Sequence, residues 1–252
     1  MRKSYRELTE EIKTDGERLK LIAALGSSDD LAYHYALISE DWAAGGTLML
    51  ENSFDRHGEA GIVFLLERLR AFGTASKTDA SAAVGTATGT GAYTDTAYLA
   101  AKILSQLRHR DFYAARAKEL AALLTARWEI SDIALRRKQI IALGWIGSEA
   151  EVDVLIRTMQ GDTDALCRAW AAAALMQLSF HAVDAAFLRE RTKTAFAEAI
   201  QKEGDLNAAG IMLEAAQTLF GKKWLSAAAA EAAEPESIEK ARKSALRFLG
   251  KA

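Results

Sequence analysis

The chain contains a single proline, Pro235, among its 252 residues, and this scarcity constrains the fold more than any other feature. Proline interrupts a helix because it lacks the amide hydrogen and clashes with the preceding turn. The chain is also rich in Ala, Leu, Glu, Lys and Arg and has few runs of β-branched residues, which favours helix from end to end. We therefore predict an all-α protein.

Capping patterns divide this helical chain into segments. Three pairs match the capping box, in which a hydroxyl and a carboxylate satisfy free backbone amides reciprocally; they are Ser4 with Glu7, Thr14 with Glu17, and Ser148 with Glu151. Glycine ends helices because it enters the left-handed conformation without steric cost; the candidate ends are Gly16, Gly26, Gly45, Gly46, Gly73, Gly144, Gly161, Gly221 and Gly250. The predicted helices cover residues 4–12, 15–25, 28–44, 59–72, 95–108, 111–126, 132–144, 148–160, 164–178, 182–200, 205–220 and 235–249.

The middle of the chain repeats. Residues 131–143 align with residues 163–175, which places Asp132 over Asp164 and Arg136 over Arg168. A helix-turn-helix unit recurring at roughly 30 to 45 residues is typical of an α-solenoid, in which each hairpin buries its apolar stripe against its neighbours. The pattern resembles HEAT repeats of the short type that also occurs in bilin lyases. Its residues here are Leu135, Arg136, Ala142, Leu143, Gly144, Ile146, Gly147, Val152, Leu155, Ile156, Met159, Asp162, Asp164, Arg168 and Leu175.

This resemblance implies a right-handed α-solenoid of stacked antiparallel helical hairpins, HEAT/armadillo-like. We expect one HEAT-like repeat domain over residues 1–252, with a mobile Gly/Ala/Thr-rich connection at 73–96 and a capping helix at 235–252. That last helix is the most basic element of the chain, and it also has an apolar face that would close the stack. Its basic face alternatively predicts docking onto an acidic partner or nucleic acid.

Charge and cysteine content narrow the function classes. The 32 Lys and Arg against 34 Asp and Glu give a net charge of -2, so no global positive field draws the chain onto nucleic acid or an acidic membrane. The single cysteine, Cys167, excludes an intrachain disulfide and suits a reducing compartment. No stretch approaches the roughly 18 uncharged apolar residues of a membrane span. We expect a cytoplasmic protein with no cofactor, no metal and no membrane association.

The HEAT resemblance also implies a structural ladder of Asp and Arg side chains that ties successive units together. The expected pairs are Asp132 with Arg136 and Asp164 with Arg168.

One arrangement of residues keeps an enzyme open as an alternative. The segment RWEISD places Trp128 four residues before Asp132, with Arg168 in a later hairpin. This resembles the Trp, Asp and distant Arg of HEAT-type alkylpurine DNA glycosylases, in which the carboxylate stabilises positive charge on the sugar as the base departs. A further alternative, a bilin lyase-like chromophore protein, depends on the repeat type alone.

The favoured hypothesis is a non-enzymatic protein, such as a bacterial adaptor, a scaffold or a toxin-neutralising protein, that binds a protein partner on a concave face. That face would consist of the second helices of successive hairpins. The expected contact residues are Glu151, Arg157, Gln160, Arg189, Arg191 and Lys193. Aromatic residues are candidate anchors where they are exposed, because Trp, Tyr and Arg dominate interface energetics; they are Trp42, Tyr98, Trp128 and Trp224.

Overall fold

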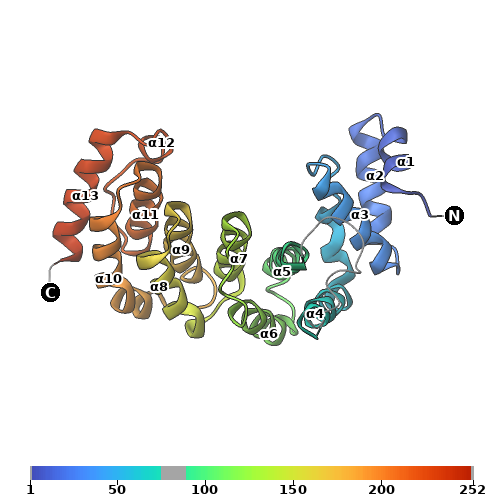
Figure 1. Ribbon diagram of the computed structural model, residues 1–252, viewed down its shortest axis with the longest axis horizontal. Coiled ribbons are helices and arrows are strands. Elements are labelled where there is room, and N and C mark those ends of the chain that lie inside the picture. Colours follow the sequence, from blue (N-terminus) through green and yellow to red (C-terminus); the bar gives the residue numbers. More distant parts are fainter. Residues whose placement is uncertain (1, 75–88, 251–252) are drawn as a thin grey trace. The chain divides into compact units, whose positions relative to one another are not determined.

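The structure, a computed structural model, describes residues 2–74 and 89–250 and is all-helical over that range (Figure 1). Thirteen α-helices and two short 3-10 helices account for its regular structure, and the described residues include no strand. No helix among them is long and apolar enough to cross a membrane. The all-α class predicted from proline scarcity and helix propensity is confirmed.

The chain divides into two compact units. The first comprises residues 1–84 and 102–116, and the second comprises residues 85–101 and 117–252. Each unit is described separately below, within the described residues. The single domain over residues 1–252 stays a prediction.

The first unit is built around a 3-10 helix. Its elements are α1 (Tyr5–Glu11), α2 (Asp15–Gly26), α3 (Leu31–Ala43), η1 (Leu50–His57), α4 (Gly58–Thr74) and the end of α5 (Gly89–Gln106). The capping boxes at Ser4 and Thr14 both form, as predicted from their spacing to Glu7 and Glu17. The η1 helix, which no capping pattern predicts, packs against α2, α3 and α4. Its Phe54 is fully buried and therefore belongs to the core of this unit.

Two histidines form a hydrogen-bonded pair inside this unit. The Nδ1 atom of His34 lies 2.8 Å from Nε2 of His57, and Nε2 of His34 lies 3.0 Å from the carbonyl oxygen of Leu50. Since a carbonyl only accepts, Nε2 of His34 carries the proton and its Nδ1 accepts from His57. His34 is completely buried. The folded state therefore favours a neutral His34, because a second proton on Nδ1 would create a buried charge and would require His57 to change its tautomer.

We predict that acid weakens the first unit through this pair. Burial lowers the pKa of His34, and His57 adds to the effect; burial also lowers the pKa of His57, against the opposing charges of Asp55 and Asp29. As the pH falls below about 6.5, His34 and His57 therefore bind protons in the unfolded chain but remain neutral in the folded chain. Stability is complete above that value and falls below it, by at most about 1.4 kcal/mol per pH unit for each proton. Urea unfolding at pH 7.5, 6.5 and 5.5 measures this slope.

The matched variants are His34→Gln and His109→Gln. His109 is exposed on the loop after α5, so its replacement should leave the slope unchanged, whereas His34→Gln should flatten it between pH 7.5 and 5.5. Equal slopes in the two variants would show that the histidine pair does not control the acid sensitivity.

The second unit consists of stacked helices in two layers (Figure 1). Its elements after α5 are α6 (Tyr113–Thr125), α7 (Ile133–Ile146), η2 (Glu149–Glu151), α8 (Val152–Gly161), α9 (Ala165–Leu178), α10 (Ala185–Lys202), α11 (Leu206–Leu219), α12 (Ala227–Glu231) and α13 (Pro235–Leu249). Helices α7, α9 and α11 lie side by side, while α8 packs on α9 and beside α10. The α13 helix covers α10 and α11 with its buried residues Ile238, Ala241, Ala245 and Leu249. This is the layered arrangement expected of a helical solenoid.

The predicted helix ends need three corrections. Gly144 lies inside α7, which continues to Ile146 and is capped by Gly147. Gly16 and Gly73 likewise lie inside α2 and α4. The α5 helix begins at Gly89 instead of residue 95, so the expected connection at 73–96 is helical at both described edges, and its remainder, residues 75–88, lies outside the described residues. Glycine in these helices is tolerated because neighbouring turns and tertiary contacts outweigh its weak propensity.

Candidate partner-binding site

An arginine ladder runs through the second unit. Arg136 on α7 pairs with the carboxylate of Asp162, the residue that follows α8, at 2.8 Å. Arg168 on α9 pairs with Glu203, the residue that follows α10, at 2.7 Å, and also donates to the backbone carbonyl of Asp162 at 2.7 Å. Arg242 on α13 donates to the backbone carbonyl of Glu203 at 2.8 Å. Each acidic residue thus joins the arginine of one hairpin to the arginine of the next.

These contacts correct the expected ladder pairs. The carboxylate of Asp132, the N-cap of α7, accepts from the amide of Leu135 at 3.0 Å, and only its backbone carbonyl accepts from Arg136, through the backbone amide of that residue. Asp164 is the N-cap of α9, and its carboxylate is held by the two-pronged guanidinium of Arg137, not by Arg168. The hydrogen bonds from Arg137 lower the pKa of Asp164 to about 2. The arginines contact acids that directly follow the second helices, and not the aspartates four residues before them that were predicted as their partners.

The ladder anchors the loop of residues 126–132 between α6 and α7. Arg136 donates to the carbonyl of Ile130 at 2.7 Å, and the buried side-chain amide of Gln139 donates to the carbonyls of Leu124 and Arg127. The guanidinium of Arg127 lies over the ring of Tyr93, 4.5 Å from its centre. These contacts fix the backbone of the loop. The positions from which its other side chains extend are therefore fixed as well.

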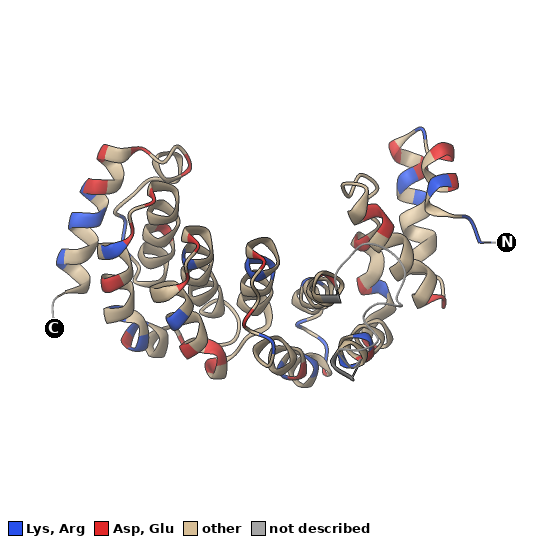
Figure 2. Cartoon of the chain, in the orientation of Figure 1, with Lys and Arg blue, Asp and Glu red and all other residues tan. Residues whose placement is uncertain are grey.

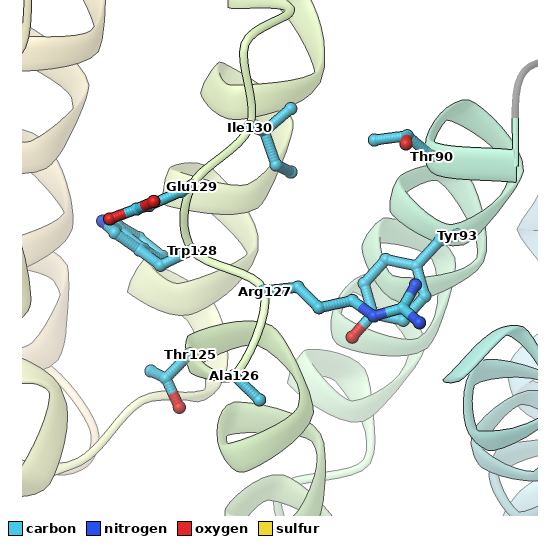
Figure 3. Close-up of a pocket in the computed structure, with 8 residues that line it drawn as sticks. All are labelled: Thr90, Tyr93, Thr125, Ala126, Arg127, Trp128, Glu129 and Ile130. Carbon is cyan, nitrogen blue, oxygen red and sulfur yellow. The ribbon is translucent and has the colours of Figure 1, made fainter. Parts of the chain in front are cut away.

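Three pockets surround this loop, and Trp128 and Glu129 line all of them. The first has a volume of about 480 Å³ and lies toward α5 (Figure 3). The second, of about 720 Å³, lies against α8, and the third, of about 650 Å³, extends to Arg136 and Thr163. Figure 3 shows Trp128 and Glu129 pointing to one side of the loop and Arg127 pointing to the other, onto Tyr93. The loop therefore carries an aromatic ring and a carboxylate at the centre of a recessed surface.

The groove against α8 is lined by the aromatic ring of Trp128 and by two charged side chains that have no ion-pair partner within the described part of the chain, Glu129 and Arg157. Trp128 is half-buried, and its indole N–H donates to the hydroxyl of Thr158 at 3.2 Å, which fixes the ring. The side chains of Glu129 and Arg157 are both exposed. Neither side chain forms a hydrogen bond or an ion pair with the described residues. A rigid aromatic side chain flanked by unsatisfied charges is suited to hold a protein segment, because the ring contributes contact area at little cost in conformational entropy.

Of the predicted contact residues, some line this groove and others lie outside it. Arg157 and Glu151 both line it, but Glu151 is only 8% exposed and uses its carboxylate in the capping box with Ser148. Glu151 as a partner contact therefore stays a prediction. Gln160 donates to Glu198 of α10, and Arg191 pairs with Asp153 of α8 at 2.7 Å, so both bridge neighbouring second helices.

The remaining two predicted residues lie on α10 away from the groove lining. Arg189 donates to the carbonyl of Leu219 at the end of α11, and Lys193 is half-buried. Sequence patterns did not indicate Glu129 as a candidate contact residue. They also did not indicate Asp162 and Glu203 as partners of the ladder arginines. An acidic residue directly after each second helix is the signal that would have identified the last two.

The three residues of the glycosylase alternative do not share any of the three pockets described above. Trp128 lines the three pockets described above, but neither Asp132 nor Arg168 does. Asp132 caps a helix, and Arg168 is engaged by Glu203. No group of three or more His, Cys, Asp or Glu side chains within residues 2–74 and 89–250 is placed to hold a metal ion.

A comparison of the sequence with models of protein families gives a match that is consistent with the stacked helices of the second unit. The family model described as HEAT repeats matches residues 90–176, which run from α5 to the end of α9. Residues 90–176 of the chain thus resemble HEAT repeats. The matched HEAT repeats include the loop of residues 126–132 and the first two arginines of the ladder, so the candidate site lies in the recognised repeats. Curated proteins and solved structures yield no match.

Proposed function

We propose that this HEAT-like repeat protein binds another protein, acting as an adaptor, a scaffold or a neutralising partner, and that it does so through the surface around Trp128. The observation that carries the proposal is the position of Trp128 and Glu129 in the lining of all three pockets around the loop. HEAT repeats are quasi-one-dimensional stacks whose extended surfaces commonly hold protein partners.

The chemistry of the groove defines what it would hold. Trp128 supplies a fixed aromatic surface, Glu129 a carboxylate for a basic side chain, and Arg157 a guanidinium for an acidic one. A polypeptide segment provides apolar and charged groups of both signs within a few residues. Interface energetics concentrate in such a central aromatic residue, whereas the charges around it set orientation and association rate.

Replacing Trp128 is expected to reduce partner binding at least tenfold. The experiment captures proteins from a nuclease-treated lysate of the source cells on immobilised protein, identifies those retained, and then measures the Kd of the purified partner. Trp128→Ala removes the aromatic wall, and a loss of 2 kcal/mol, which is at the threshold of an interface hot spot, corresponds to roughly thirtyfold in Kd.

The matched control is Phe180→Ala. Phe180 is the most exposed of the large hydrophobic side chains, at 67%, and lies on the turn after α9; its loss should leave the Kd unchanged. If Trp128→Ala and Phe180→Ala bind the partner equally well, the site is placed wrongly. If the unaltered protein retains no protein after nuclease treatment, the binding function itself fails.

A further inference from the structure

The outward face of α13 is a stripe of cations. Ile238, Ala241, Ala245 and Leu249 form its buried face, while Lys240, Lys243 and Arg247 are exposed. Figure 2 shows acidic residues near the start of this helix and basic residues along the rest. The three basic side chains form no ion pair with any described acidic residue. At a rise of about 1.5 Å per residue, Lys240 and Arg247 are separated by about 10 Å along the helix.

A second basic segment adjoins the end of this stripe. Lys222 lies over the ring of Phe248, with Nζ 4.6 Å from its centre, and the ring of Trp224 lies 5.8 Å from that of Phe248. Lys222 and Lys223 are both exposed. The turn after α11 therefore places Lys222 beside the last turn of α13, and the exposed Lys223 follows it in the chain.

Helix stability alone does not account for these charges. A basic residue complements the helix dipole only within the last turn, which explains Arg247 but not Lys240 or the two lysines outside the helix. Four other basic residues of the second unit form ion pairs, namely Arg137 with Asp164, Lys138 with Asp95, Arg168 with Glu203 and Arg191 with Asp153, whereas unpaired ones such as Arg157 are not grouped on one helix face as those of α13 are. Beyond Glu236 and Glu239 near its start, α13 thus carries a local group of exposed cations on a chain whose net charge is -2.

We propose that this surface, formed by Lys222, Lys223, Lys240, Lys243 and Arg247, is a second binding site that takes an acidic helical segment of a partner protein. Side chains three and four residues apart share one face of a helix, so the cations at 240, 243 and 247 match carboxylates at the same spacing on a second helix packed alongside. Opposite potentials on the two surfaces raise the association rate and fix the register.

An acidic protein segment fits this surface better than a nucleic acid does. Single-stranded nucleic acid is held by base stacking on open aromatic faces, but Lys222 lies over the ring of Phe248, and the rings of Phe220 and Trp224 also contact Phe248. Phosphate binding without stacking also depends on a larger positive field than a chain of net charge -2 provides.

The test uses three fluorescein-labelled probes: a helical peptide with Glu at positions i, i+3 and i+7, the same peptide with Gln at those positions, and a short DNA duplex. Anisotropy titrations of the full-length protein in 50 mM and 200 mM salt give each Kd. The variant K240E/K243E/R247E reverses the stripe. The variant K13E/K20E/K118E makes the same change of net charge at three exposed lysines on other elements.

We expect the Glu peptide to bind, the Gln peptide to bind at least tenfold more weakly, and K240E/K243E/R247E to raise the Kd of the Glu peptide at least tenfold. K13E/K20E/K118E and Trp128→Ala should leave that Kd within twofold, which keeps this site distinct from the groove at Trp128. The proposal is overturned if the two triple variants bind the Glu peptide equally, or if the DNA duplex binds more tightly than the peptide and loses that affinity in K240E/K243E/R247E.

Discussion

Replacing Arg168 with alanine is expected to destabilise the second unit by about 3 kcal/mol, because it leaves a buried carboxylate without its cation. The side chain of Glu203 is 1% exposed, and Arg168 contacts both of its oxygens, at 2.7 and 2.8 Å. The amide of Asp205 still donates to the same carboxylate at 3.0 Å, which places the loss at the lower end of the range for a broken buried pair. Thermal unfolding should show a fall in Tm of about 6–12 °C.

The pH dependence of this loss distinguishes the ion pair from simple side-chain truncation. Burial raises the pKa of Glu203, but the hydrogen bonds from Arg168 and from the Asp205 amide outweigh it and lower the pKa overall. A lowered carboxyl pKa contributes stability above the unfolded value, about 4.3, and loses it as the pH falls through the folded value. The difference between the unaltered protein and Arg168→Ala should therefore be largest at pH 7 and shrink below about pH 4.3.

A double variant provides the control for Arg168→Ala. Arg168→Met with Glu203→Leu removes both charges and keeps apolar volume, and such replacements of buried pairs are often neutral. It should recover most of the stability lost in Arg168→Ala. A double variant as unstable as Arg168→Ala at neutral pH would mean that the unpaired charge is not the cause of the loss.

Gly144→Ala is expected to destabilise the second unit by about 2–3 kcal/mol, although alanine is the better helix former. A Cβ atom at residue 144 would lie 2.9 Å from Cα and Cβ of Ala174 and 2.7 Å from Oε1 of Gln177. The first two atoms belong to the backbone and the shortest side chain of α9, so α7 and α9 must separate. Forcing extra atoms into a close-packed interface costs about 1–3 kcal/mol. Urea unfolding at pH 7 measures the effect.

Gly161→Ala is the matched control, since it makes the same change at the end of α8 where a Cβ meets nothing within 4 Å. That substitution should be neutral or stabilising by up to about 1 kcal/mol, because alanine reduces the entropy of the unfolded chain. Ala174→Gly added to Gly144→Ala should return part of the lost stability. If both glycine variants change stability by the same amount, close approach of α7 and α9 is not what the glycine provides.

The sequence alone predicts the features of this protein that depend on a few neighbouring residues. The capping boxes at Ser4, Thr14 and Ser148 form because each joins residues three apart, within one turn of helix. The alignment of Asp132 with Asp164 indicated HEAT-like repeats, and the HEAT repeat model matches residues 90–176, which include both aspartates. The two aspartates are equivalent, since both cap the first helix of a hairpin.

Only the tertiary structure decides which distant groups meet. Gly144 and Gly161 are alike in sequence, yet one permits close contact with Ala174 and the other ends a helix in open space. Arg136 and Arg168 find their acids 26 and 35 residues away, because the length of each second helix and the packing of each hairpin determine which carboxylate comes within reach. Likewise, Trp128 becomes the centre of a recessed surface only because α7 and α8 hold its loop. Local propensity specifies where helices begin and end, whereas the ladder and the pockets arise from packing between helices that the sequence pattern does not encode residue by residue.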